Sequence, residues 1–489
     1  MSDAGLTFRP AFELRELIAA RRVSPVELTE ACLRRIEALN PHLNAFLTVA
    51  GTRAADEARQ AEQSVMRGDN QVRLLGIPIS IKDLEPVAGM PCTRGSLVFR
   101  DYVPDYDEIA VARLRAAGAI VVGKTNTPEF GRLGTTENRL GEDCRNPWNP
   151  DTTTGGSSGG AAASVAAGMV PIAQGSDGGG SIRIPSSFCG LVGIKATQGR
   201  IPRRGQGLLS WHPINFSSVG PMTRTVRDAA LLLDLTAGPA PDAEPGTLPV
   251  APSSYEAVVI EASANPDVLK GLRVAWTPDF GTAAVDPEVA AAVQASVEVL
   301  GRLGAQVVDA PIEINVDWLW QAYFTITAVK TSQSFGKLLD QKREQLTDYV
   351  IGDISLGRRV TADRYHRALC EIEQHRAAVE ALFEHCDILA TPTTSVTAFP
   401  HRKNPGVIGG KHVDRRWGFY PFTFPFNVSG HPAANVPCGF SKTGMPMGMQ
   451  LVGRQGDEVT ILKAAAAFEA VMPWSGYRPP EALAGARPA

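Results

Sequence analysis

The chain has 489 residues, of which 44% are hydrophobic and 20% charged, and its formal net charge is −3. This balance is typical of a globular protein with a large core and excludes a disordered chain. With 48 basic and 51 acidic residues and no long basic run, the sequence does not predict a nucleic-acid partner. Seven scattered cysteines, a polar N-terminus and the lack of a long apolar run predict a cytoplasmic protein without a membrane span.

Residues 1–70 are expected to form a helical segment packed on the core. Ser24 is a good N-cap, Pro25 suits the first helical position, and Glu27 completes a capping box. An apolar stripe at helical spacing follows, and the pair at 40–41, Asn-Pro, is expected to end this helix.

Short apolar runs then alternate with helical segments. Residues 74–83 and 119–126 are predicted to be buried strands, with a helix over 107–118 between them. Further strand candidates are LRVAWTP, AQVVDAP, CDILATPTT, AANVPCGF and MGMQLVGR, and VTILKAAAAFEAVM is predicted as a closing helix. Strands this apolar belong in a sheet covered on both faces, so the predicted class is α/β.

Two segments depart from this alternation. Residues 237–266 are rich in proline and alanine and are expected to form an exposed loop within one fold. Residues 311–385 are expected to form a variable helical region near the substrate entrance.

The segment GAIVVGKT, residues 118–125, matches the phosphate-loop pattern GxxxxGK[ST]. A working phosphate loop curls around the phosphates and leads into a helix. Here the middle residues predict an extended strand, and Pro128 interrupts any helix that follows. The context therefore argues against nucleotide binding.

Ser181 directly follows three glycines in AQGSDGGGSIRIP. Such a backbone suits a serine nucleophile with an oxyanion hole made of main-chain N–H groups. None of the eight histidines stands in a catalytic motif, although His212 and His431 remain loop candidates for the activating base.

Two other segments offer chemistry. The stretch TTTGGSSGGAAASVAAG, residues 152–168, is predicted to open a tightly packed helix, with a flexible linker as the alternative. Lys82 ends an apolar strand, where it either pairs with an acid such as Asp83 or is a desolvated amine able to act as a base.

Together these segments resemble the amidase signature family of serine hydrolases. The similarity rests on residues 155–185 and on GIPISIKD, and it continues through FGRLGTTENRLGEDCRNPWNP, CGLVGIKATQGRIP, GPMTRTVRD and PFNVSGHPAANVPCG. Ala196 departs from the proline that is common in relatives. The resemblance implies one amidase domain over 1–489 with a large mixed β-sheet covered by helices on both faces, an α/β/α sandwich.

The resemblance also implies a triad. Ser181 is then the nucleophile, Ser157 the bridging serine that follows a cis peptide bond, and Lys82 the base, while Ser158 is the natural misassignment. The main-chain N–H groups of Gly178, Gly179 and Gly180 are expected to form the oxyanion hole.

Other positions have candidate roles. LGTTEN resembles the acyl-side contact segment of the family, so Gly134 and Thr135 are expected substrate contacts. Trp211 is a candidate for an apolar pocket, as are Trp318, Trp320 and Trp417, with core or surface packing as the alternative. Asp177 and Arg183 are expected to hold the loop, and a carboxylate-binding role is the alternative for Arg183.

The predicted function is hydrolysis of a small-molecule amide through an acyl-enzyme, without metal or organic cofactor. An aryl or hydrophobic acyl amide is favoured, with esters and carbamates as further candidates. The alternative is the glutaminase subunit of a tRNA-dependent amidotransferase. A monomer or homo-oligomer is expected, with no membrane or nucleic-acid partner and an alkaline activity optimum.

Overall fold

A computed structural model describes residues 2–69, 72–204, 214–310 and 312–480. Its main strands are β1 (Phe46–Val49), β2 (Pro78–Lys82), β3 (Ile120–Thr125), β6 (Ile172–Asp177), β7 (Val192–Lys195), β8 (Ser218–Thr223), β9 (Arg273–Trp276), β10 (Gln306–Val308), β11 (Ile388–Pro392), β14 (Ala433–Phe440) and β15 (Pro446–Gly453). Within the described residues these eleven strands form one sheet in the order β1-β3-β2-β6-β8-β7-β14-β15-β11-β9-β10. Strand β2 runs parallel to β3 and β6, whereas β6 and β8 are antiparallel, so the sheet is mixed as predicted.

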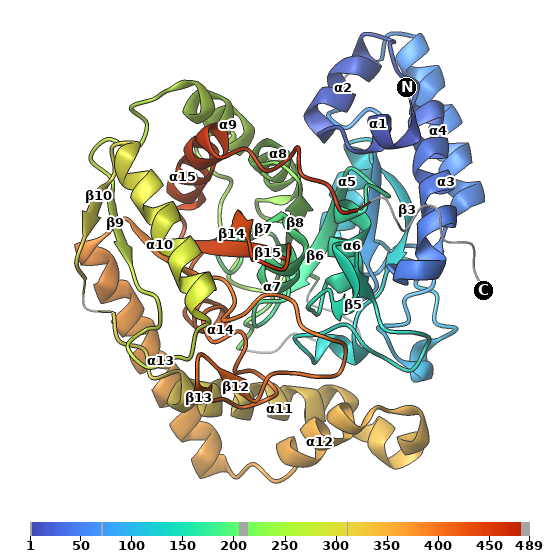
Figure 1. Cartoon of the computed structure of the whole chain (residues 1–489). Coiled ribbons are helices and arrows are strands. Elements are labelled where there is room, and N and C mark those ends of the chain that lie inside the picture. The colour runs from blue at the N-terminus through green and yellow to red at the C-terminus, as the bar shows by residue number, and fades with distance from the viewer. Residues whose placement is uncertain (1, 70–71, 205–213, 311, 481–489) are drawn as a thin grey trace.

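Helices surround this sheet (Figure 1). They are α1 (Asp3–Thr7), α2 (Ala11–Ala19), α3 (Pro25–Leu43), α4 (Gly51–Met66), α5 (Ile109–Ala116), α6 (Gly159–Ala166), α7 (Arg183–Cys189), α8 (Val226–Thr236), α9 (Tyr255–Ala264), α10 (Pro287–Arg302), α11 (Val316–Gln341), α12 (Asp348–Gly357), α13 (Ala362–His385), α14 (Phe424–Ser429) and α15 (Glu458–Val471). Two small hairpins, β4 (Arg145–Asn146) with β5 (Asn149–Thr153) and β12 (Val407–Ile408) with β13 (Lys411–His412), lie outside the main sheet. Among the described residues, no helix is both long and apolar enough to cross a membrane.

Strand β2 shows how the two faces of the sheet differ. Ile79 and Ile81 pack in one cluster with Leu231 of α8. Ser80 faces the other way, and its Oγ lies 3.0 Å from Oγ of Ser164 on α6. Because successive side chains on a strand point to opposite faces, Lys82 at the end of β2 shares the face of Ser80. The sequence alternation thus places this lysine on the side of α6.

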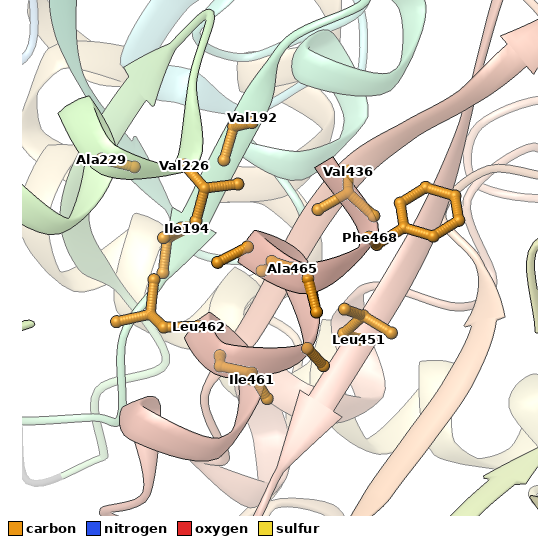
Figure 2. Close-up of a cluster of buried hydrophobic side chains, with 14 of the residues drawn as sticks. Val192, Ile194, Val226, Ala229, Val436, Leu451, Ile461, Leu462, Ala465 and Phe468 are labelled. Atoms are coloured by element: carbon orange, nitrogen blue, oxygen red, sulfur yellow. The ribbon is translucent and has the colours of Figure 1, made fainter. Parts of the chain in front are cut away.

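On the face of α8, the core is built around α15. Its Ile461, Leu462 and Phe468 are buried in a cluster that includes Ile194 of β7 and Leu451 of β15 (Figure 2). Each of these side chains is at most 1% exposed. Full burial of such a side chain is worth about 1.5–3 kcal/mol, so this layer fixes the central strands on which the site depends.

The predicted helix that begins at Ser24 extends farther than expected. The Ser24 hydroxyl accepts hydrogen bonds from the N–H groups of Val26 and Glu27, which confirms the predicted start. The predicted end at 40–41 is wrong, because α3 continues to Leu43. Proline removes only its own N–H, whereas Asn44 N–H still donates to the Asn40 carbonyl at 2.8 Å, and Leu43 is fully buried.

The expected loop over 237–266 is only partly a loop. Residues 255–264 form helix α9, where Ser254 accepts a hydrogen bond from Ala257 N–H as the N-cap. The apolar side chains of Tyr255 and Val259 are buried in the core cluster of α15, which explains why this part is helical. Residues 312–385, by contrast, are mainly helical as predicted, in α11, α12 and α13.

The phosphate-loop pattern at 118–125 falls on β3, which is extended and buried throughout. A short 3₁₀ turn at Glu129–Gly131 follows it in place of a phosphate-binding helix. This geometry does not present curled N–H groups to a phosphate, in agreement with the sequence argument.

Candidate active site

The site forms where parallel strands β2 and β6 end side by side. Parallel strands bring their carboxyl ends to the same edge of a sheet, so Lys82 at the end of β2 lies beside the end of β6. Its Nζ donates hydrogen bonds to Ser157 Oγ at 2.7 Å and to the Ser176 carbonyl at 3.1 Å. These contacts join the predicted base to the predicted bridging serine.

Lys82 does not form the ion pair with Asp83 that the sequence left open. The Asp83 carboxylate instead lies 3.1 Å from Nζ of Lys124, and both of these side chains are fully buried. Among the described residues, no carboxylate lies within 4.0 Å of Nζ of Lys82. Burial lowers the pKa of Lys82 to about 7, although the negative charges of Glu85 and Asp177 oppose this shift. Much of the amine is therefore uncharged near neutral pH, as a proton acceptor must be.

Ser157 is placed by tight packing at the start of α6. The Gly156–Ser157 peptide bond is cis, as the resemblance implies. Gly156 lies against the backbone of Thr135, and Gly160 against the backbone of Asn126, so neither position has room for a Cβ atom. The segment is thus a closely packed helix start and not a flexible linker.

Ser158 has a different environment from Ser157. Its hydroxyl donates to the Ser176 carbonyl at 3.1 Å, and its N–H donates to the Ser181 carbonyl at 3.1 Å. The second bond holds the loop of Ser157 next to Ser181. Ser157 and Ser181 both line the same cavity, which places the two predicted triad hydroxyls at one site.

Ser181 lies between β6 and α7 on a loop organised by Asp177. This carboxylate accepts from Gly180 N–H at 2.7 Å and from Ile182 N–H at 3.2 Å, and it pairs with Arg183 at 2.9 Å. Burial alone would raise the pKa of Asp177, but the charge and hydrogen bonds of Arg183 lower it well below its usual value. The expected role in holding the loop is therefore present.

Arg183 is fully buried and its donors are used within the protein. Besides Asp177 it donates to the Thr423 carbonyl at 2.9 Å and to side-chain oxygens of Gln450 and Asn427, both at 2.6 Å. These bonds give it a structural role and leave the alternative of a substrate carboxylate without a geometric basis.

The expected oxyanion hole needs one correction. The N–H of Gly180 is already committed to Asp177, because the buried carboxylate is the stronger acceptor close to it. Gly178 and Gly179 line the cavity, and Tyr323 Oη donates to the Gly178 carbonyl at 2.8 Å. Since the N–H and C=O of a peptide unit point in opposite directions, that bond fixes the direction of Gly179 N–H.

Two of the three glycines before Ser181 occupy positions that have no room for a side chain. A Cβ at Gly179 would lie 2.5 Å from Tyr323 Oη, and a Cβ at Gly180 would collide with the Thr423 side chain. Gly180 also has a φ of +125°, which other residues rarely adopt.

The cavity in front of Ser181 has a volume of about 210 Å³. One face of α11 supplies much of its wall, at helical spacing: Trp320, Tyr323, Phe324, Thr327, Lys330, Thr331 and Ser334. Sequence reasoning named Trp320 here but missed Tyr323 and Lys330 as cavity residues, and their common spacing of three or four residues was the signal that could have found them.

The other expected substrate contacts have mixed outcomes. Gly134 lines the cavity. A Cβ atom at this position would lie 2.7 Å from the Tyr420 ring. Thr135 is buried and its hydroxyl donates to Glu137 at 3.0 Å. Trp417 stacks on Trp320, with ring centroids 5.1 Å apart.

Trp211 and His212 lie outside the described residues. Trp318 is 39% exposed on the surface of α11. No histidine is among the described residues that line the cavity. His431, the remaining candidate base, instead contacts Ser429 at 3.0 Å and stacks on Phe383.

Comparisons with known proteins agree with this geometry. The Amidase family model matches residues 27–462. An acylamidase of Rhodococcus erythropolis is 37% identical, with 99% of each chain aligned. One subunit of the glutamyl-tRNA(Gln) amidotransferase of Roseiflexus castenholzii is 36% identical over 96% of each chain.

Among solved structures, a bacterial aryl acylamidase of the amidase signature family superposes with a TM-score of 0.90. It is 30% identical, and the match covers 99% of this chain and 100% of that one. The family match, the relatives and the shared fold together show that this chain belongs to the amidase signature family and is an amide hydrolase.

Proposed function

We propose that the protein cleaves its amide through an acyl-enzyme formed on Ser181. Neutral Lys82 accepts the proton of Ser157, which in turn accepts the proton of Ser181 as the hydroxyl oxygen attacks the amide carbon. The N–H groups of Gly178 and Gly179 stabilise the resulting oxyanion. The relay then returns the proton to the leaving amine, and water hydrolyses the acyl-enzyme. The observation that carries this proposal is the 2.7 Å contact between Ser157 Oγ and a fully buried amine that has no carboxylate within 4.0 Å among the described residues.

The proposed substrate is an aryl or hydrophobic acyl amide, with the corresponding esters and carbamates as further candidates. The support is the wall of the cavity, to which Phe130, Trp320, Phe324, Phe335 and Tyr420 contribute rings. Aromatic walls of this kind favour apolar, ring-bearing ligands over small polar amides. The bacterial aryl acylamidase with the same fold gives independent support.

Glutamine hydrolysis as part of an amidotransferase is the second candidate. The amidotransferase relative that is 36% identical favours it, because its alignment spans nearly the whole chain. The aromatic wall argues for the first candidate. We also propose that the protein acts in the cytoplasm as a monomer or homo-oligomer, which is consistent with its free thiols.

A hydrolysis screen of anilides, primary amides, glutamine, esters and carbamates tests the proposal, with Ser181→Ala as the matched variant. We expect cleavage of an anilide and a loss of at least about 10⁴-fold in kcat for Ser181→Ala. Electrophilic trapping of the acyl group, followed by mass spectrometry of the peptide that contains Ser181, measures the intermediate directly. Rapid cleavage of glutamine with no anilide activity would instead support the glutaminase.

A further inference from the structure

The cavity of Ser181 has a charged side as well as an aromatic one. Basic and acidic residues of several elements line it together: Arg94, Arg132, Arg203, Arg204, Lys330, Arg416, Glu85, Glu108 and Glu244. Burying charged groups costs free energy unless each is compensated. A purely apolar substrate would compensate none of them, so this lining is not explained by an apolar substrate alone.

Most of these basic side chains have partners. Arg132 and Arg416 each lie 2.7 Å from the Asp353 carboxylate. Arg203 lies 4.0 Å from Glu85, and Lys330 donates to the Asn215 side chain at 3.5 Å.

Arg204 is also compensated. Its guanidinium donates to the Asp107 carbonyl at 3.2 Å and lies over the Tyr106 ring. A carboxylate thus lies within 4.0 Å of four of the six basic residues, since Asp242 is 3.5 Å from Arg204, whereas Lys330 has the neutral amide of Asn215 as its described partner.

Arg94 differs from the other five. It is only 3% exposed, yet among the described residues its Nε and Nη1 have no hydrogen-bond partner and no carboxylate lies within 4.0 Å of it. Its guanidinium carbon is 5.7 Å from the centre of the Phe99 ring, a contact that gives Nε and Nη1 no acceptor. A buried cation with free donors is costly unless a ligand supplies an acceptor.

The backbone holds Arg94 in place. Its φ of +57° is unusual for a residue with a Cβ, and the strain persists because both of its backbone groups are engaged. Its N–H donates to the Asp83 carbonyl at 3.1 Å, and its carbonyl accepts from Phe130 N–H at 2.8 Å. The next residue, Gly95, lies against the backbone of Thr127 with no room for a Cβ. The side chain is therefore presented from a rigid support.

We propose that Arg94 is a specificity residue that binds a carboxylate carried by the substrate away from the scissile amide. This proposal rests on the proposed function and narrows it to amides that combine a ring or apolar group with a carboxylate. A guanidinium binds a carboxylate more strongly than it binds a neutral carbonyl oxygen, because charge assists the hydrogen bonds. The carboxylate thus supplies the acceptor and the negative charge that the described protein does not place beside Arg94.

Two matched substrate pairs test the proposal on the wild-type enzyme. Succinanilate and butyranilide differ by a carboxylate on the acyl side, and 4-acetamidobenzoate and 4-acetamidotoluene differ by a carboxylate on the amine side. We expect kcat/KM to be at least tenfold higher for the charged member of one pair. Absence of a preference in both pairs would overturn the proposal even if Arg94 variants did not fold.

The variants Arg94→Gln and Arg416→Gln then separate binding from general effects of charge. We expect Arg94→Gln to reduce the ratio of kcat/KM between charged and neutral substrates to below threefold. Arg416 lines the same cavity but is already paired, so its variant should retain the preference. An unchanged ratio in Arg94→Gln, or an equal loss in both variants, would refute the role of Arg94. If neither the neutral nor the charged anilides are cleaved in a manner that depends on Ser181, the proposed function itself fails.

Discussion

Lys82 and Lys124 lie near the carboxyl ends of neighbouring parallel strands, and both side chains are fully buried. Lys124 has the Asp83 carboxylate 3.1 Å away, whereas Lys82 has a serine hydroxyl and a main-chain carbonyl. A carboxylate stabilises the charged ammonium form of a lysine. A hydroxyl can pair with either form, because it accepts a hydrogen bond from an ammonium group and donates one to a neutral amine. Burial is therefore the same for these two lysines, and what differs between them is the chemical nature of the partner.

The largest expected effect is the loss of catalysis when Lys82 is replaced. Lys82→Met removes the proton acceptor while keeping a side chain of similar length, so kcat should fall by at least about 10³-fold. Steady-state kinetics on an anilide, with circular dichroism to monitor the fold, measures this change. Activity within tenfold of wild type would show that another group takes the proton of Ser157.

Replacement of Lys124 should mainly reduce the stability of the fold. Lys124→Met leaves the buried Asp83 without its cation, which should reduce the free energy of unfolding by about 3–5 kcal/mol. Denaturant unfolding measures the change. The double variant Lys124→Met/Asp83→Asn is the control and should recover part of the loss, because it removes the uncompensated charge. Equal destabilisation by Lys82→Met and Lys124→Met would contradict the proposal that Lys124 is structural and Lys82 catalytic.

The smallest expected effect concerns the pH profile. Burial lowers the pKa of Lys82 to about 7, so kcat/KM should rise with pH through about 7 and then level off. The nearby negative charge of Glu85 opposes that shift, so Glu85→Gln should lower the pKa of Lys82 further and move the rise to lower pH by up to about one unit.

A pH series of kcat/KM for wild type and Glu85→Gln measures the displacement. Glu244→Gln is a suitable control, since Glu244 lines the cavity without being among the charges that act on Lys82. A wild-type profile that stays flat down to pH 5 would contradict a lysine base.

The strand and the helix start that carry the site could be predicted from the sequence because local sequence patterns specify them. The apolar run that ends in Lys82 predicts its strand, and the small residues around Ser157 predict a helix start that packs closely. The resemblance then assigned the two serines and the lysine to one triad, and the structure places both serines at one cavity and Lys82 against Ser157.

The rest depends on contacts between distant segments. Gly180 N–H donates to Asp177, whose carboxylate also accepts a hydrogen bond from Asn427, 250 residues later in the chain. No local pattern near residue 180 carries that information. That Nε and Nη1 of Arg94 have no hydrogen-bond partner among the described residues is likewise a property of the assembled cavity, since the neighbours of Arg94 in the sequence do not predict it.

The bonds of Arg183 have a consequence for biosynthesis. This side chain ties the nucleophile loop to Asn427 and Gln450, which lie in the last fifth of the chain. A nascent polypeptide that still lacks these residues lacks the contacts that Arg183 makes with them. We therefore expect hydrolytic competence to arise late in translation, and premature termination upstream of residue 427 to yield an inactive product.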